Sequence, residues 1–239
     1  MAENTAVQVE ICVGSVDDAL VAERAGADRV ELCADLGQGG TTPSLGAVSV
    51  ALTELRRAGV QVMIRPRGGD FHCDPTLEKV ALADIAAIRT LPNPHRLPLG
   101  FVLGALTHDG RLDQPVLRRL ITACGPHQVT LHKAFDATPD LHDALEAAVD
   151  LGVTRILTSG GLESALAGID RLRALQTQSA GRIVILAGGG IRPDNAAAVI
   201  AGSGITEIHL RAPTLKNGTE ATDPDLVRRM VELAHHPLI

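Results

Sequence analysis

The sequence predicts a (β/α)8 barrel, because short β-branched runs alternate eight times with Ala- and Leu-rich amphipathic stretches. No linker rich in Ser, Gly or Pro interrupts this alternation, so we expect a single domain over residues 1–239. A doubly wound open sheet is the alternative fold, but its first strand is usually followed by a glycine-rich turn. The corresponding turn here, residues 12–15, reads Cys-Val-Gly-Ser and contains one glycine. The barrel is therefore the better prediction.

The expected elements follow one another with short connections. The strands are apolar runs at 7–12, 28–33, 60–65, 99–104, 128–133, 153–158, 182–187 and 205–210. The helical patterns lie near 15–25, 43–58, 74–91, 113–123, 138–151, 163–175, 192–201 and 224–236. Suitable N-cap residues begin four of these helices, namely Ser15, Ser44, Asp113 and Thr138, with Pro115 and Pro139 early in the first turn of the last two.

The composition excludes several classes of partner. The net charge is −6 and the aromatic residues are three Phe, so we expect neither a basic nucleic-acid surface nor a platform for stacking bases. No apolar run is long enough to span a bilayer, and residues 1–8 lack a basic leader pattern, so we expect no membrane partner and a cytoplasmic location. Four Cys in 239 residues predict reduced thiols. The sequence leaves assembly into a homo-oligomer open.

Two apolar runs repeat one pattern 21 residues apart, Val-Glu-Ile-Cys at 9–12 and Val-Glu-Leu-Cys at 30–33. Residues two apart share a face of a strand, so Glu10 should lie on the same side as Cys12, and Glu31 on the same side as Cys33. If these strands are parallel neighbours, two thiols and two carboxylates meet in a small volume. The thiols then either fill the barrel as small apolar residues or bind a soft metal ion.

Further polar residues collect at the expected C-terminal strand ends, where barrel enzymes have their active sites. Glu10 and Glu31 could pair there with arginine and lysine side chains as a structural network, or act as a general acid and base. The candidates for proton transfer are Glu10, Glu31, His132 and Lys133. The cationic partners considered for the two glutamates are Arg65 together with Lys133 or Arg211.

Two segments predict that a small anionic ligand binds at this end of the barrel. Residues 65–70 (Arg-Pro-Arg-Gly-Gly-Asp) combine arginine forks, which suit carboxylate or phosphate groups, with glycines that allow close approach. Residues 187–191 (Ala-Gly-Gly-Gly-Ile) end the seventh strand, where barrels often bind phosphate through backbone N–H groups. The expected substrate-binding residues are Arg65, Arg67, Asp70, Ser159, Gly188, Gly189, Gly190, His209 and Arg211.

Several segments together resemble the CutC family, which is associated with copper homeostasis. They are Glu-Ile-Cys-Val, Gly-Ala-Asp-Arg-Val-Glu-Leu-Cys, Gly-Gly-Thr-Thr-Pro-Ser, Met-Ile-Arg-Pro-Arg-Gly-Gly-Asp-Phe, Gly-Ala-Leu-Thr, Leu-Thr-Ser-Gly-Gly and Ala-Gly-Gly-Gly-Ile. The resemblance runs from about Val9 to His209, and the segment from Met63 to Phe71 is highly specific. It implies a TIM-like barrel, a cytoplasmic location and a role with copper. The ligands that it implies for Cu(I) are the thiols of Cys12 and Cys33.

The chain departs from the family pattern in several places. The eighth strand ends His209-Leu210-Arg211-Ala212, where the family has Cys or Ser after the histidine. Lys133 stands where the family has Arg, which keeps the charge and loses a bidentate donor. His72 and Cys73 add two soft ligands near the barrel mouth, and the sequence assigns them no role.

Two functions remain as hypotheses. One is a cytosolic copper-homeostasis protein that binds Cu(I) through the two strand-end thiols and needs no other cofactor. The other is an enzyme of the lyase or isomerase type that acts by acid–base chemistry on a small anionic or phosphorylated metabolite. Copper(I) binding alone does not call for the Glu, Arg and His residues that gather at the barrel mouth.

Overall fold

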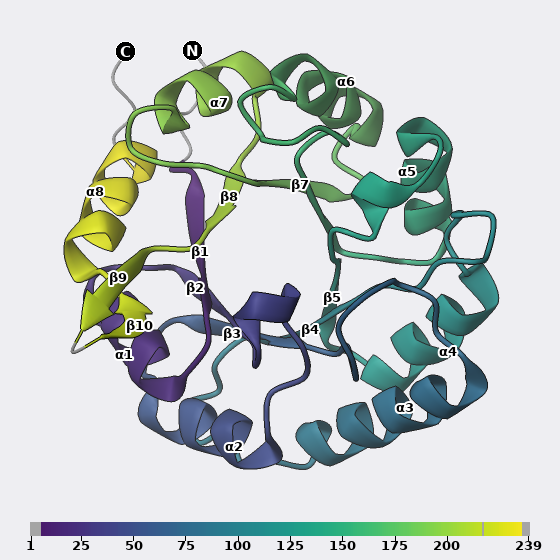
Figure 1. Cartoon of the computed structure of the whole chain (residues 1–239), viewed down its shortest axis with the longest axis horizontal. Helices are drawn as coiled ribbons and strands as arrows, with labels where there is room; N and C mark the ends of the chain where they lie inside the picture. The colour runs from purple at the N-terminus through teal and green to yellow at the C-terminus, as the bar shows by residue number, and fades with distance from the viewer. Residues whose placement is uncertain (1–5, 217, 236–239) are drawn as a thin grey trace.

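The protein is a closed eight-stranded barrel within a ring of helices, seen in a computed structural model that describes residues 6–216 and 218–235 (Figure 1). Each strand is parallel to the next from β1 to β8, and β8 pairs with β1 to close the sheet. The predicted (β/α)8 fold is thereby confirmed. The strands are β1 (Gln8–Val13), β2 (Arg29–Leu32), β3 (Gly59–Met63), β4 (Leu99–Leu103), β5 (Gln128–Leu131), β6 (Arg155–Thr158), β7 (Val184–Gly188) and β8 (Glu207–Leu210).

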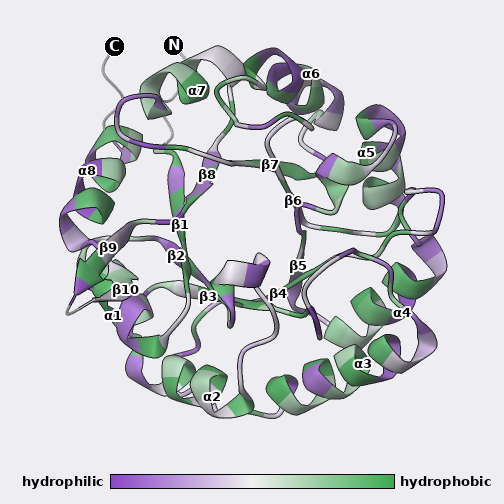
Figure 2. Cartoon of the chain, viewed as in Figure 1, coloured by the Kyte–Doolittle hydropathy of each residue, from purple (hydrophilic) through white to green (hydrophobic). Residues whose placement is uncertain are grey.

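The helices pack around the outside of the barrel, and most carry hydrophobic and hydrophilic residues side by side (Figure 2). They are α1 (Val16–Arg24), α2 (Leu45–Glu54), α3 (Pro75–Arg89), α4 (Gln114–Cys124), α5 (Leu141–Asp150), α6 (Ile169–Ser179), α7 (Ala196–Ser203) and α8 (Pro224–His235). Two short 3-10 helices, η1 (Leu36–Gln38) and η2 (Phe135–Ala137), lie in loops at the barrel mouth. In the described part of the chain, no helix has the length and apolar character needed to cross a membrane.

Three of the four predicted N-caps are confirmed. Ser15, Ser44 and Asp113 each accept a hydrogen bond from a backbone N–H in the first turn of α1, α2 and α4. The prediction for Thr138 was wrong, because the chain first forms η2 and the Thr138 hydroxyl donates to the Phe135 carbonyl. Asp140 caps α5 instead, with a carboxylate that accepts from two N–H groups.

Other predicted boundaries also shift. Helix α6 begins at Ile169 rather than near residue 163, because a loop over residues 159–168 precedes it, and α7 begins at Ala196 rather than near 192. The last predicted helix extended to residue 236, which lies outside the described residues. Residues 1–5, part of the segment considered for a leader pattern, also lie outside them. The sequence analysis missed a hairpin of β9 (Pro213–Lys216) and β10 (Thr219–Thr222), which follows β8.

The two faces of the barrel sheet differ in chemistry. Outward-facing residues such as Val9 and Ile11 are fully buried in the hydrophobic core that β1 and its neighbours share with the helices. The inner face is polar at the start of several strands. There the Glu207 carboxylate binds Arg29 at 2.5 Å and Arg155 at 2.6 Å, and Arg29 also forms an ion pair with Glu10. We call these four residues the floor network.

Candidate functional site

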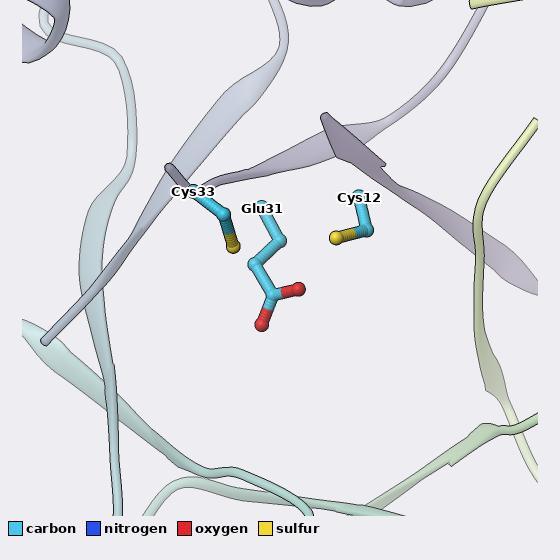
Figure 3. A group of neighbouring side chains, drawn as sticks. All are labelled: Cys12, Glu31 and Cys33. Carbon is cyan, nitrogen blue, oxygen red and sulfur yellow. The ribbon is translucent and has the colours of Figure 1, made fainter. Parts of the chain in front are cut away.

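Two thiols and a carboxylate meet inside the barrel, near the C-terminal ends of β1 and β2. One ligand atom each from Cys12, Glu31 and Cys33 lie within 4.8 Å of one another. The parallel register places Cys12 beside Glu31, and Figure 3 shows the Glu31 side chain between the two thiols. The residues Cys12 and Cys33 are 8% and 2% exposed, so the group is almost sealed from solvent. The thioether side chain of Met63 packs against the same cluster.

The surroundings of the thiols favour their protonated forms. A hydrogen bond with Cys33, burial and the nearby Glu31 carboxylate raise the pKa of Cys12 well above its usual value. The hydrogen bond with Cys12 lowers the pKa of Cys33, but burial and the carboxylates of Glu31 and Glu10 outweigh it, so that this pKa is raised as well. Without a metal ion, both side chains are therefore thiols at neutral pH, and metal binding must release protons.

A carboxylate and an imidazole form an ion pair directly beside the thiols. His209 Nε2 donates to Glu31 Oε2 at 2.9 Å. Burial would lower the pKa of His209, but the charge of Glu31 and hydrogen bonds with Cys12 and Glu31 raise it well above its usual value. Burial would raise the pKa of Glu31, but the charge and hydrogen bond of His209 lower it. The pair is therefore an imidazolium and a carboxylate at neutral pH.

The cationic partner of Glu10 differs from the three that the sequence suggested. Glu10 is fully buried and forms its ion pair with Arg29 of the floor network, while its other oxygen lies 3.9 Å from His209 Nε2. The predicted pairing of the two glutamates with Arg65, Lys133 or Arg211 was wrong. The register explains the difference, because Glu10 lies opposite Arg29 on the adjacent strand β2.

The imidazole of His132, the residue that follows β5, is buried against the backbone of Gly104, the residue that follows β4. The backbone of Gly104 allows this, since a Cβ atom there would lie 2.4 Å from His132 Cε1. The Ala134 N–H donates to His132 Nδ1 at 3.1 Å, and the buried Nε2 has no partner among the described residues. Burial and the nearby charge of Arg65 lower the pKa of His132 to about 4. The ring is therefore neutral at pH 7, with its proton on Nε2 as a free donor.

The three candidate arginines already bind groups of the protein. Arg65 donates to the carbonyl oxygens of Gln38 at 2.9 Å, Gly40 at 3.1 Å and Gly69 at 2.6 Å, so it fastens the η1 loop to the loop after β3. Arg67 pairs with Asp70 at 2.6 Å on the exposed part of that loop. Arg211 pairs with Glu220 of β10. A ligand would have to compete with these contacts.

The glycine turn after β7 lies beside Lys133. A Cβ atom at Gly189 would lie 3.3 Å from Lys133 Nζ and 3.1 Å from Ser159 Cβ, so the three residues adjoin. Gly188 is buried next to His209, and Gly189 and Gly190 both have positive φ. The Ser159 hydroxyl, however, is engaged with the Asp136 carboxylate at 3.0 Å and the Leu162 carbonyl at 2.7 Å.

Sequence reasoning missed several residues of the interior. Asp136 also accepts from the N–H groups of Ser159 and Gly161 and from Lys133 at 3.5 Å, so it shapes the loop after β6. Gln61 is fully buried with both amide atoms unpartnered among the described residues, and Gly100 leaves space for it. The sequence did carry a signal for Gln61, because it is the one polar side chain in the apolar run 60–64.

A cleft of about 800 Å³ leads to Cys12. The cleft begins at Cys12 and is bordered by η1 through Leu36 and by both strands of the hairpin β9–β10.

Among the described residues, the two extra soft ligands in the loop after β3 do not join the site. The His72 ring packs on the His108 ring with 4.0 Å between their centroids, and Cys73 packs against the hydrophobic core.

The chain is similar to proteins of a known family. The sequence model of the CutC family matches residues 7–214. The chain is 45% identical over 205 residues to a CutC family protein of Bacteroides thetaiotaomicron, covering 86% of this chain and 80% of the relative. It is 44% identical over 209 residues to the human "copper homeostasis protein cutC homolog", covering 87% and 74%.

Solved structures extend the comparison. The CutC crystal structure from Streptococcus agalactiae superimposes with a TM-score of 0.78 and 32% identity, covering 85% of this chain and 97% of the other. A phosphoribosylanthranilate isomerase from Thermotoga maritima superimposes with a TM-score of 0.61 over 95% and 98% of the two chains, at 14% identity. At that identity the likeness concerns the barrel fold alone.

Proposed function

Because this chain belongs to the CutC family, we propose that it serves copper homeostasis by binding Cu(I) through the thiolates of Cys12 and Cys33. The observation that carries the proposal is the meeting of two buried thiols, with a thioether packed against them, at the inner end of a cleft. Soft sulfur ligands select Cu(I). Met63 is the candidate for a third ligand. The proposal includes a cytoplasmic location, since reducing conditions keep unpaired thiols available.

The charges of the surroundings fit a monovalent ion bound by two thiolates. Cu⁺ with two thiolates has a net charge of −1, and the Glu31 carboxylate beside it adds another negative charge. The His209 imidazolium compensates, because it is paired with Glu31 at 2.9 Å directly beside the thiols. Binding releases two thiol protons, so the affinity for Cu(I) should rise with pH.

The test is an anaerobic Cu(I) titration against a competing chelator. The wild-type protein should bind one Cu(I) tightly, and Cys12→Ser/Cys33→Ser should lose this binding. Cys73→Ser is the matched control, because it removes a half-buried thiol remote from the cluster. Met63→Leu conserves volume and should weaken binding only if the thioether is a ligand. Binding that is weak, or that persists in the double variant, would refute the proposal.

A second candidate function is acid–base catalysis on a small anionic metabolite. The neutral His132 donor and the unpartnered Gln61 amide favour it, because two thiolates that bind Cu(I) make no use of either group. Lys133 beside the glycine turn would hold the anion, since its pair with Asp136, at 3.5 Å, is longer than the pairs of Arg67 and Arg211. Inorganic phosphate should then raise the melting temperature of the wild type and not of Lys133→Ala. Equal shifts in both proteins would refute this candidate.

A further inference from the structure

We propose a second metal site within the barrel, in which Glu10, Glu31 and His209 bind a divalent transition-metal ion through oxygen and nitrogen atoms. It is distinct in ion and ligand set from the thiol site, beside which Glu31 and His209 also lie. One ligand atom from each of its three residues lie within 4.8 Å of one another. The three residues come from neighbouring strands, with Glu10 opposite His209 across the pairing of β1 with β8.

The distances between the ligand atoms leave space for an ion. His209 Nε2 is 2.9 Å from Glu31 Oε2 and 3.9 Å from Glu10 Oε1. Metal–ligand bonds of about 2.0–2.2 Å place neighbouring ligand atoms about 3–4 Å apart. The two observed separations are close to this range. The second is too long for a hydrogen bond, so Glu10 Oε1 faces the imidazole without binding it.

Two carboxylate oxygens at this place have no partner. Glu10 Oε1 and Glu31 Oε1 are buried and form no hydrogen bond to any described residue, while Glu10 is 0% and Glu31 3% exposed. An unsatisfied buried oxygen is costly, and a charged one especially so. The other oxygen of each carboxylate is already engaged, by Arg29 and His209 respectively. A cation beside Glu10 Oε1 and the Glu31 carboxylate would compensate the charge of both residues.

The ligand chemistry selects the ion. Two carboxylates and one imidazole suit borderline to hard divalent ions such as Zn²⁺ or Mn²⁺, whereas Cu(I) prefers the sulfur atoms. The ion would take the place of the proton that His209 now shares with Glu31. The ion pair of Glu10 with Arg29 fixes one carboxylate, as partners behind metal ligands commonly do. Mn²⁺ is the best probe, because thiols compete for it weakly.

The experiment measures Mn²⁺ binding to the full chain from the loss of the electron paramagnetic resonance signal of free Mn²⁺. We expect one Mn²⁺ per chain in the wild type and in Cys12→Ser/Cys33→Ser, and at least about tenfold weaker binding in Glu31→Gln and His209→Gln. Asp194→Asn, at an exposed acid, is the control that should bind as the wild type does. This pattern separates the proposal from copper binding, which the double cysteine variant should lose.

Three results would overturn the proposal of a second site. The wild-type protein could bind no Mn²⁺ at millimolar concentration, His209→Gln could bind Mn²⁺ as well as the wild type, or Cys12→Ser/Cys33→Ser could lose Mn²⁺ binding. Because Glu31 is buried and the His209 side chain is only 12% exposed, their variants could fail to fold. A Mn²⁺-soaked crystal of the wild-type protein then decides the question. An anomalous peak between the two carboxylates and the imidazole supports the site, and a map without one refutes it.

Discussion

Replacement of Gly104 by alanine should destabilise the barrel by forcing a methyl group into the His132 ring. The new Cβ would lie 2.4 Å from Cε1 and 2.6 Å from Nδ1 of His132. The ring is 3% exposed, and a shift would strain the hydrogen bond from the Ala134 N–H. Overpacking of this kind costs about 1–3 kcal/mol. For a chain of this size each kcal/mol lowers the melting temperature by about 2–4 °C. We therefore expect a decrease of about 2–12 °C.

Thermal and urea unfolding of a small set of variants would test this prediction. Gly46→Ala is the matched control, because the nearest atom to its new Cβ is 3.9 Å away and the residue lies in α2. Alanine there should stabilise the protein by up to about 1 kcal/mol. In a His132→Ala background the obstacle is gone, so Gly104→Ala should cost almost nothing. A melting temperature of Gly104→Ala at or above wild type, or an equal cost in both backgrounds, would refute the reasoning.

Three further predictions concern charged residues of different burial. Glu207→Gln should destabilise the protein by about 3–5 kcal/mol in urea unfolding, because it leaves the two arginines of the floor network without their shared carboxylate. Burial would raise the pKa of Glu23, but the N–H groups of residues 56–58 bind its carboxylate and lower this pKa. Its contribution to stability is therefore present above about pH 4.5 and is lost as pH falls through the lower folded pKa. The stability difference between wild type and Glu23→Gln, about 1–3 kcal/mol at pH 7, should therefore shrink in acid. Arg211→Ala should change the free energy of unfolding by less than about 1 kcal/mol, since its pair with Glu220 is partly exposed; a larger loss would contradict this.

The periodicity of the sequence was sufficient for the fold and for the centre of the site. Alternation in two strands indicated that Cys12, Cys33 and Glu31 would face one volume, and the parallel register of β1 with β2 places them there. The starts of several helices were not predictable in the same way. Thr138 and Asp140 are both residue types that cap helices, and the turn η2 before Thr138 places the helix start at Asp140.

The partners of the charged residues could not be predicted, because sequence gives the sign of a charge but not what lies around it. Arg65 was expected to meet a carboxylate, yet three backbone carbonyl oxygens of nearby loops bind its guanidinium. Glu10 binds Arg29 because the strand register, which no local pattern reveals, places them opposite each other. Met63 joined the thiols for a similar reason, as it belongs to the next strand of the closed sheet.

The closure of the barrel between β8 and β1 has a consequence for biosynthesis. Cys12 and Cys33 lie in the first 33 residues, whereas His209, which supplies the compensating charge, belongs to the final strand. A ribosome-bound chain that has emerged only as far as β7 therefore contains both thiols, but it lacks the His209 imidazole and the pairing of β8 with β1 that closes the barrel around them. Neither metal site can be complete before the last strand docks against the first. Metal loading should thus follow release of the chain from the ribosome, and a protein truncated before β8 should retain neither site.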